Sequence, residues 1–348
     1  MAAWLAIIAS RDGIGKGAAG QYNRVEDAQT VEALILAGGG GTRMSRISAH
    51  LPKPLLYLPG GTILEHQLAL LARLPLSRVL VITRYKERQI EQTLYGVGAV
   101  AVVPQEAPYT LLGALATAEG QIRETCIVLH GDNYFSQALD YVADAARAEM
   151  ESSGSQALFV VAPERKRGDQ AERLALTGCC VLSPSLFATA KKLRAGDELR
   201  HLTQALIDSG VGVRECALRG WRQNINEPGD LLAVSRRILE NWTASFHPPE
   251  ADAGYNRALQ SFEMEPPVWV SPQAQVVDSH LGPLTVVGPG ARVRSCALRE
   301  AIVFPGAEVE RQEVVRGIVL PESQGCVSLA AESDVGSGDE GYSQQEEA

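Results

Sequence analysis

The sequence places four glycines in a row where an apolar run ends: Gly38, Gly39, Gly40 and Gly41. The apolar run covers residues 32–37 and has the length of a buried strand. Because glycine adopts positive φ angles and has no side chain, the N–H groups of such a loop can surround an anion closely. Thr42 and Arg43 follow, and Lys53 lies ten residues after Arg43, between two prolines. Backbone amides with one arginine and one lysine together suit a nucleoside triphosphate.

Two better-known glycine motifs do not fit this loop. The dinucleotide fingerprint Gly-x-Gly-x-x-Gly fails because Arg43 stands where the third glycine should be. The P-loop pattern fails because no lysine follows the glycines directly. The remaining alternative is a plain glycine-rich turn, which explains neither the arginine nor the Pro-Lys-Pro segment.

Three stretches of the sequence form a recognisable set. The first is Leu-Ala-Gly-Gly-Gly-Gly-Thr-Arg, followed by Leu-Pro-Lys-Pro-Leu and by Leu-Glu-His-Gln-Leu at residues 64–68. The second is Leu-His-Gly-Asp-Asn-Tyr-Phe at 129–135, and the third is Gly-Trp-Arg-Gln-Asn-Ile-Asn-Glu-Pro-Gly-Asp-Leu at 220–231. Over residues 32–320, the chain resembles the sugar-1-phosphate nucleotidyltransferases, which are the nucleoside-diphosphate-sugar pyrophosphorylases.

This resemblance assigns roles on the nucleotide side of a site. It implies that the four glycines and Thr42 bind the triphosphate, that Arg43 binds its outer phosphates, and that Lys53 contacts the phosphate at the reacting centre. Gln105 stands where the family has a glutamine that reads the base. Without the resemblance, Arg43 would be interpreted as a surface ion-pair partner and Lys53 as a solvated loop residue.

The resemblance also implies a magnesium site. Asp132 would hold Mg²⁺ on the α-phosphate, because magnesium favours one or two carboxylates together with substrate phosphates. The other interpretation of Asp132 is a turn aspartate in Gly-Asp-Asn. The family's second metal aspartate aligns with Asn224, which can coordinate through its carbonyl oxygen but brings no charge. Asp230 lies too far along the chain and is expected to cap the next helix.

The sugar side departs from the family pattern. Gly178 matches the glycine of the family's sugar site, but the Val-Glu-Lys-Pro segment that supplies a glutamate and a second lysine is missing. A charged stretch at residues 164–173 stands in its place, where Glu164 and Lys166 are the candidate substitutes. The same stretch could be only a solvated loop. Near the base, Thr-Leu-Leu at residues 110–112 replaces the usual family sequence, so we expect a reshaped base or sugar pocket.

Composition limits the classes of function. The chain has 348 residues, 45% of them hydrophobic, and a net charge of −9, which argues against sequence-independent nucleic-acid binding. No apolar segment approaches the roughly 18 residues of a membrane span. The six cysteines form no Cys-x-x-Cys pair, so we expect reduced thiols in a cytoplasmic protein rather than a zinc site. Residues 1–30 are expected to be a flexible extension, and the acidic residues 323–348 a disordered tail.

Apolar runs alternate with amphipathic segments through most of the chain. The expected strands are residues 32–37, 78–83, 97–103, 125–129, 156–162, 178–182 and 211–218, and the expected helices are 62–74, 86–94, 111–122, 185–193, 198–209 and 228–242. This alternation predicts an α/β domain over residues 31–242, with a Rossmann-like, mostly parallel sheet covered on both faces. Ligands of such sheets bind beyond the carboxyl ends of the strands, where the glycine loop and Asp132 would meet.

A six-residue rhythm follows a linker that is expected over residues 243–262. Leu-Gly-Pro-Leu-Thr-Val begins at residue 281 and Val-Gly-Pro-Gly-Ala-Arg at residue 287. An aliphatic residue at every sixth position fits a parallel β-helix, and the resemblance implies that it is left-handed and covers residues 263–322. About three coils fit, so the module is expected to cap the protein or to join copies of it. A hexapeptide-repeat acyltransferase is an alternative, with His280 as its candidate catalytic histidine.

These observations together predict an Mg²⁺-dependent nucleotidyltransferase. It would transfer a nucleoside monophosphate from dTTP or GTP to a hexose 1-phosphate or a carbocyclic sugar-like phosphate of a specialised pathway, such as antibiotic biosynthesis. The attacking phosphate is already ionised, so alignment and charge neutralisation replace a general base. We expect a homo-oligomer formed through the β-helix and no nucleic-acid or membrane partner. A non-catalytic relative that binds a nucleotide sugar and regulates a partner is the main alternative.

Overall fold

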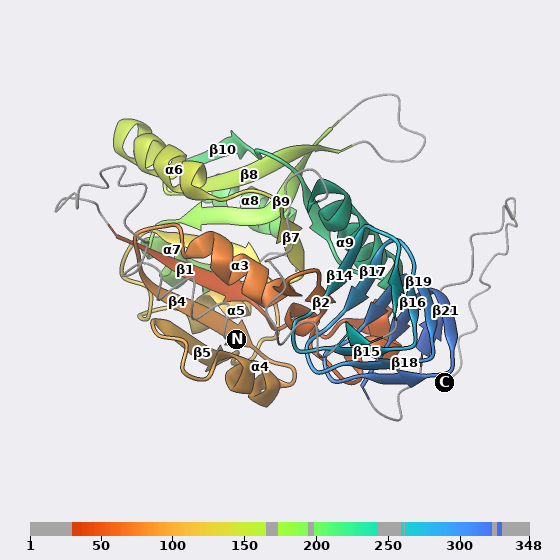
Figure 1. Cartoon of the computed structure of the whole chain (residues 1–348). Coiled ribbons are helices and arrows are strands. Elements are labelled where there is room, and N and C mark those ends of the chain that lie inside the picture. The colour runs from red at the N-terminus through yellow and green to blue at the C-terminus, as the bar shows by residue number, and fades with distance from the viewer. Residues whose placement is uncertain are drawn as a thin grey trace, which may run out of the picture. The chain divides into compact units, whose positions relative to one another are not determined.

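The computed structural model of the chain describes residues 30–164, 173–193, 198–242, 259–260, 262–321 and 326–328 (Figure 1). The chain divides into two compact units, with the division between Ser235 and Arg236 inside helix α9 (Pro228–Trp242). The segments expected to be an N-terminal extension, a linker and an acidic tail lie almost entirely outside the described residues. The domain boundaries given above therefore stay predictions.

The first unit is built on a seven-stranded sheet with the strand order β10-β8-β9-β6-β1-β4-β5. Its strands are β1 (Val31–Leu36), β4 (Leu76–Thr83), β5 (Val100–Pro104), β6 (Cys126–His130), β8 (Ala157–Glu164), β9 (Arg173–Leu182) and β10 (Val213–Ala217). The central strand β1 pairs in parallel with β4 and β6, whereas β9 is antiparallel to both β6 and β8. The prediction of a mostly parallel α/β sheet is confirmed, and β9 is its antiparallel strand.

Helices cover both faces of this sheet (Figure 1). They are α3 (Ile63–Leu71), α4 (Glu87–Leu94) and α6 (Asp140–Ser153) in one core cluster, and α5 (Leu111–Thr117), α7 (Ser185–Ala190) and α8 (Leu199–Asp208) in the other. Ala33 and Ile35 of β1 pack in the first cluster and Leu34 in the second. Successive side chains of a strand point to opposite faces, so a continuously apolar strand must be buried on both sides.

A membrane-spanning helix would need about 18 apolar residues, and the described part of the chain contains no helix of that kind.

Backbone hydrogen bonds join the loops at the carboxyl ends of the parallel strands. The N–H of Gly131 donates to the carbonyl oxygen of Leu36 at 2.9 Å, and the N–H of Gln105 donates to that of Thr83 at 2.6 Å. The loops after β1, β5 and β6 therefore start at one edge of the sheet. Open α/β sheets bind their ligands at this edge, so the fold positions the predicted site residues for a shared site.

The second unit consists of short parallel strands stacked in coils. They include β14 (Val268–Val270), β15 (Gln275–Val277), β16 (His280–Leu281), β17 (Thr285–Val287), β18 (Arg292–Arg294), β19 (Ala297–Val303), β20 (Glu308–Glu310) and β21 (Glu313–Val319). The buried residues Val276, Val293 and Val309 lie opposite one another in successive coils, which gives coil lengths of 17 and 16 residues. These coils confirm the predicted parallel β-helix, although they are slightly shorter than three six-residue units. Strand β22 (Cys326–Ser328) adds to β21 in the antiparallel direction.

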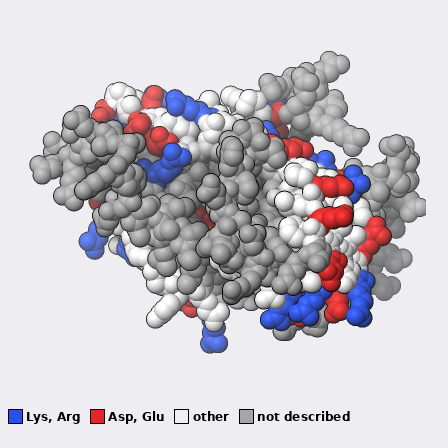
Figure 2. Space-filling model, in the orientation of Figure 1, with Lys and Arg blue, Asp and Glu red and all other residues white. Residues whose placement is uncertain are grey.

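Charged side chains of both signs are mixed on the surface. Figure 2 shows Lys and Arg interspersed with Asp and Glu over the described part of the visible face. Within the β-helix unit, Arg292 and Glu308 form an ion pair at 2.7 Å, and Arg236 and Glu300 form another at 2.8 Å. The described surface on the visible face therefore carries both signs of charge.

Candidate nucleotide-binding site

A cavity of about 310 Å³ opens at the carboxyl ends of β1, β4, β5 and β6. Five residues predicted from the sequence line it: Gly38, Gly39, Lys53, Gln105 and Asp132. The second half of the glycine loop lies beyond these lining residues. Arg43 is exposed on the short 3-10 helix η1 (Thr42–Met44) that follows the loop. The structure therefore brings the start of the glycine loop together with the lysine, the glutamine and the aspartate, whereas Arg43 is not among the residues that line the cavity.

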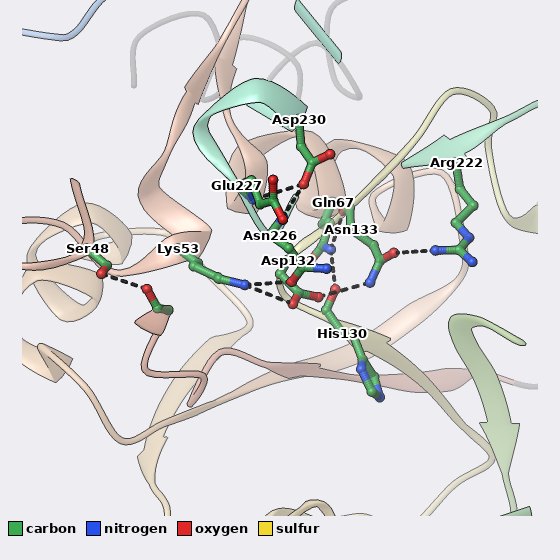
Figure 3. A network of polar contacts seen from close by, with 11 residues as sticks. Ser48, Lys53, Gln67, His130, Asp132, Asn133, Arg222, Asn226, Glu227 and Asp230 are labelled. Carbon is green, nitrogen blue, oxygen red and sulfur yellow. Dashed lines mark hydrogen bonds and ion pairs between the residues drawn. The ribbon is translucent and has the colours of Figure 1, made fainter. Parts of the chain in front are cut away.

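The glycine loop combines two constrained positions with two open ones. A Cβ atom on Gly38 would lie 3.0 Å from Gln105 Oε1, and one on Gly41 would lie 3.0 Å from the Cβ of Ser48. Gly41 also has a φ angle of +61°, and Ser48 Oγ donates to its carbonyl oxygen at 2.8 Å (Figure 3). Around Gly39 and Gly40, a Cβ would meet nothing within 4 Å. The ends of the loop are thus fixed, while its middle presents bare backbone to solvent.

Lys53 is a buried lysine with two oxygen partners. It begins the 3-10 helix η2 (Lys53–Leu55), and Pro52 and Pro54 restrict the backbone on either side. Its Nζ lies 3.0 Å from Asn226 Oδ1 and 3.5 Å from Asp132 Oδ2, and its side chain is 11% exposed (Figure 3). The interpretation as a solvated loop lysine is therefore wrong, because the ammonium group is held inside the site.

Asp132 lies in the turn between β6 and β7 (Asn133–Phe135). Its Oδ1 accepts a hydrogen bond from Asn133 Nδ2 at 3.0 Å, and its side chain is 28% exposed. Gln67, which is 1% exposed on α3, donates from Nε2 to the carbonyl oxygens of His130 and Asn133, at 2.8 Å each. The glutamine of the Leu-Glu-His-Gln-Leu motif therefore fixes both ends of the turn that presents the Asp132 carboxylate.

The segment after Trp221 brings a further asparagine into the site. Strand β11 (Arg222–Asn224) pairs antiparallel with β7 and sets Asn224 opposite Asn133. Asn226 comes after this strand and contacts Lys53. Asp230 Oδ2 accepts from the backbone N–H groups of Asn226 at 2.8 Å and of Glu227 at 2.9 Å. Asp230 thus lies inside the first turn of α9 rather than at the N-cap position, and its carboxylate reaches back to the residues before the helix. It thereby holds the Asn226 backbone in place.

The donor atoms near Asp132 can be tested for their fit to a magnesium ion. Among the described residues, no group of three or more His, Cys, Asp or Glu side chains could hold a metal alone. Asp132 brings one carboxylate, and Asn224 Oδ1 is buried with no hydrogen-bond partner in the described part of the chain. Magnesium often takes only one or two protein ligands, because substrate phosphates and water complete its shell. The donors therefore fit a magnesium ion that binds together with a triphosphate.

Gln105 is oriented by the loop that follows it. Its Nε2 donates to the carbonyl oxygen of Thr110 at 2.8 Å and to that of Pro108 at 3.2 Å. Its Oε1 faces Gly38. Arg84 and Tyr109 line the same cavity, with the guanidinium carbon 4.6 Å from the ring centroid, a cation–π distance. Sequence reasoning predicted the glutamine and missed this pair.

The sugar-side candidates are spread over two strands and a segment outside the described residues. Gly178 on β9 has a φ angle of +81°, and a Cβ there would lie 2.7 Å from Asn133 Nδ2. Glu164 is the exposed last residue of β8 and stands opposite Arg173 in the strand register. Lys166 lies outside the described residues. The structure therefore brings Gly178 to the Gly-Asp-Asn turn, while the role of the other two stays a prediction.

Two titratable groups that the sequence did not single out lie around the same turn. Burial lowers the pKa of the Arg222 guanidinium, whereas Glu164 and Asp132 act in the opposite direction. Burial also lowers the pKa of His130, with Asp132 opposing and Arg222 adding to the effect. His130 Nε2 is buried without a partner among the described residues. The His130 ring is therefore neutral at pH 7.

The missed residues differ in whether any sequence signal existed. Arg84 and His130 stand at the ends of apolar strands, as the glycine loop does, so the same rule could have found them. Arg222 and Asn226 reach the site because β11 pairs with β7, a contact between segments about 90 residues apart. No local pattern predicts such a pairing. The only signal in the sequence was their position beside Asn224 in the family stretch 220–231.

Comparison with known proteins places the chain in a family. Residues 33–211, half of the chain, match the family described as MobA-like NTP transferase domain. The chain is 22% identical over 331 residues to a glucose-1-phosphate thymidylyltransferase of Streptomyces antibioticus, covering 83% of this chain and 92% of that protein. It is 26% identical over 314 residues to a mannose-1-phosphate guanylyltransferase of Mycobacterium tuberculosis, covering 80% and 81%.

A solved structure shows the same fold. It is a Bacillus anthracis protein described as a candidate glucose-1-phosphate thymidylyltransferase in complex with sucrose, with a TM-score of 0.53 and 17% identity. The match covers 64% of this chain and 98% of that chain. At this identity the likeness concerns the fold alone. From the family match and the two relatives, the chain belongs to the MobA-like NTP transferase family and is a distant homologue of the sugar-1-phosphate nucleotidyltransferases.

Proposed function

We propose that this protein transfers a nucleoside monophosphate from a nucleoside triphosphate to a sugar 1-phosphate, giving an NDP-sugar and pyrophosphate. The observation that supports this best is the buried Lys53 ammonium group, 3.5 Å from the Asp132 carboxylate in a cavity that Gly38 and Gly39 also line. A fixed cation, a carboxylate and bare backbone in one cavity suit the alignment of two phosphorylated substrates.

The proposed reaction needs alignment more than proton transfer. An oxygen of the sugar phosphate attacks the α-phosphorus, a new P–O bond forms, and the bond to the β-phosphate breaks as pyrophosphate leaves. The attacking oxygen is already ionised at neutral pH, so the chain has to neutralise charge and hold the substrates in line. We assign Lys53 to the reacting phosphate, and Gly38, Gly39, Gly40, Gly41 and Thr42 to the triphosphate. Arg43, which is exposed, is assigned to the outer phosphates.

A divalent metal completes this assignment. We assign Asp132 to Mg²⁺, with the buried carbonyl oxygen of Asn224 as the second candidate donor. When bound, the ion would supply positive charge to the α-phosphate. Since Asn224 is neutral, Asp132 would be the charged protein ligand in this pair.

The orientation of Gln105 favours particular bases. Its Nε2 is engaged by two backbone carbonyl oxygens, which leaves its Oε1 to accept a hydrogen bond from a base. Guanine, thymine and uracil present a ring N–H donor on their pairing edge, whereas adenine and cytosine present a ring acceptor there. Among the triphosphates that carry such a donor, we propose dTTP or GTP. The thymidylyltransferase and guanylyltransferase names of the two relatives are in line with this choice.

The acceptor is proposed to be a hexose 1-phosphate or a carbocyclic sugar-like phosphate of specialised metabolism. Gly178, next to Asn133, supports a sugar site on this side of the turn. Glu164 and Lys166 are assigned to the same side. The missing Val-Glu-Lys-Pro segment is the reason to include acceptors other than common hexose phosphates.

The test is a screen of triphosphates against sugar 1-phosphates, with pyrophosphate release as the readout. We expect turnover with dTTP or GTP and at least one acceptor, and loss of turnover in Asp132→Ala. If no pair turns over but a nucleotide sugar binds tightly, the protein is a regulatory relative and the proposed catalysis is wrong. In that case, the uncharged Asn224 at the second metal position would explain the absence of turnover.

For the β-helix, we propose a role in joining copies of the chain. Val315 on β21 is 51% exposed and offers a position at which to test this role. Light scattering should give a mass above that of one chain, and Val315→Glu should reduce it.

Acyl transfer has less support, because His280 is half-exposed and both of its ring nitrogens face carboxylates. Nδ1 lies 3.4 Å from Glu263 Oε2, and Nε2 lies 3.5 Å from Glu265 Oε1. Acetyl-CoA consumption that depends on His280 would reverse this judgement.

A further inference from the structure

Arg222 is a half-buried arginine whose hydrogen-bonding capacity is largely unused. Its NH1 donates to Asn133 Oδ1 at 3.5 Å, and its NH2 donates to the carbonyl oxygen of Leu176 at 3.3 Å. Both contacts are long and both acceptors are neutral, while a guanidinium group has five N–H donors. Within the described residues, no carboxylate lies within ion-pair distance of this group. The positive charge therefore lies beside the Gly-Asp-Asn turn without a direct negative partner among the described residues.

The surroundings of Arg222 link it to the proposed metal ligand. Asn133 donates from Nδ2 to Asp132 and accepts at Oδ1 from Arg222, so one amide joins the carboxylate to the guanidinium. Figure 3 shows Lys53 on one side of Asp132 and Asn133, and Arg222 on the other. Asp132 and Glu164 both favour the charged form of Arg222, against the effect of burial on its pKa. Two cations therefore flank one carboxylate.

We propose that Arg222 binds the phosphate of the sugar 1-phosphate, and this inference rests on the proposed function. Lys53 then faces the nucleotide and Arg222 faces the acceptor, so that each of the two anions meets its own cation. Gly178, which matches the sugar-site glycine, approaches the same Asn133 side chain that Arg222 contacts. Arg222 would also supply the positive charge that the absent Val-Glu-Lys-Pro segment does not bring.

A purely structural role for Arg222 makes a different prediction. If it served only to tie Asn133 to the Leu176 carbonyl, its loss would lower stability and weaken every ligand of the site alike. As a phosphate ligand, it should affect the sugar phosphate far more than the triphosphate. Charge-assisted hydrogen bonds to a phosphate are about twice as strong as neutral ones, which makes the difference measurable.

The experiment compares Arg222→Gln and Arg222→Lys with the matched control Arg219→Gln. Arg219 is exposed and lies over the Tyr141 ring at 4.5 Å, away from the cavity. Isothermal titration with glucose 1-phosphate, mannose 1-phosphate and inorganic phosphate gives the dissociation constants, and titration with dTTP and GTP gives those of the nucleotides. Thermal unfolding of each variant reports stability.

We expect Arg222→Gln to weaken binding of the sugar phosphates about tenfold or more and to leave nucleotide binding within about twofold. Arg222→Lys should keep part of the lost affinity, and Arg219→Gln should match the wild type. The proposal is overturned if folded Arg222→Gln binds the sugar phosphates normally, or if Arg222→Lys is no better than Arg222→Gln. It is also overturned if the wild type binds none of the three phosphates.

These binding measurements separate two kinds of failure. Absence of turnover with every substrate pair would reject the proposed catalysis. A selective loss of sugar-phosphate affinity in Arg222→Gln would still support the assignment of Arg222 in that case. Conversely, turnover that survives Arg222→Gln with an unchanged KM for the sugar phosphate rejects the assignment and leaves the proposed function intact.

Discussion

The proposed nucleotide side and the proposed sugar side of Asp132 are built in different ways. On the nucleotide side, bare backbone at the end of β1 and a lysine between two prolines line the cavity. On the sugar side, single side chains and one glycine from β7, β9 and β11 meet around Asn133. The first arrangement depends on short continuous stretches of sequence, whereas the second depends on which distant strands pair. Changes in the sugar-side strands can therefore alter the acceptor site without disturbing the glycine loop.

The largest effect is expected for Lys53→Ala. It removes the fixed ammonium group beside Asp132, and loss of one such transition-state contact costs on the order of 10²–10³-fold in kcat. The pyrophosphate-release assay measures the change, with the exposed Lys192→Ala as a control for general effects of lysine loss. Activity near wild type in Lys53→Ala would show that the nucleotide side does not depend on this cation.

Gly178→Ala tests the sugar side. The new Cβ would need positive φ and would lie 2.7 Å from Asn133 Nδ2, so we expect the KM for the sugar phosphate to rise roughly tenfold and stability to fall by about 1–3 kcal/mol. Gly154→Ala is the matched control, because it has a φ of +66° and open space around its Cβ. Equal rises in the KM values of both substrates would mean that the two sides are not separable.

Gln105→Leu should have a smaller and more selective effect. It removes the proposed acceptor for the base N–H, so preference for dTTP or GTP over ATP should fall by about tenfold, which corresponds to about 1.4 kcal/mol. Gln121→Leu is the control, since Gln121 donates to the Thr117 carbonyl oxygen and does not line the cavity. Unchanged base preference in Gln105→Leu, as judged by kcat/KM for each triphosphate, would remove the glutamine from the nucleotide side.

The smallest expected effect is on the pH dependence of stability, through His130, which directly precedes the Gly-Asp-Asn turn. Burial lowers the pKa of His130 below its ordinary value of about 6.5. As the pH falls through this value, the unfolded chain therefore binds a proton at His130 before the folded chain does. The free energy of unfolding should therefore fall as pH drops below about 6.5, by at most about 1.4 kcal/mol per pH unit for this group. Burial also lowers the pKa of His66, which therefore adds to the pH dependence of the free energy of unfolding.

Urea unfolding at pH 7.5, 6.5 and 5.5 measures this dependence. His130→Asn removes one titrating group, so its free energy of unfolding should change less with pH than that of the wild type. His66 remains in that variant and serves as the internal reference. If the free energy of unfolding changes equally with pH in the two proteins, the His130 ring does not contribute to the pH dependence.

Sequence reasoning was most successful for residues at strand ends. The glycine loop and Lys53 were recognisable from neighbouring residues, and Gln105 and Asp132 from the family resemblance. The first part of the loop does meet the other three in one cavity. Arg222 and Asn226 lie in the family stretch 220–231, but their side-chain contacts could not be predicted because they follow from the pairing of β11 with β7. The β-helix was predicted from its six-residue rhythm, but its 16- and 17-residue coils follow from corners that the rhythm does not specify.

The two prolines around Lys53 have a thermodynamic consequence for ligand capture. Pro52 has a φ of −68°, and Pro54 is fixed in the same way by its ring, so the main chain that bears the lysine has little freedom left once folding is complete. Ordering of this segment therefore adds little entropic penalty when a triphosphate enters. The affinity for a triphosphate near Lys53 should therefore depend strongly on ionic strength. It should depend little on how far this segment is ordered at a given temperature.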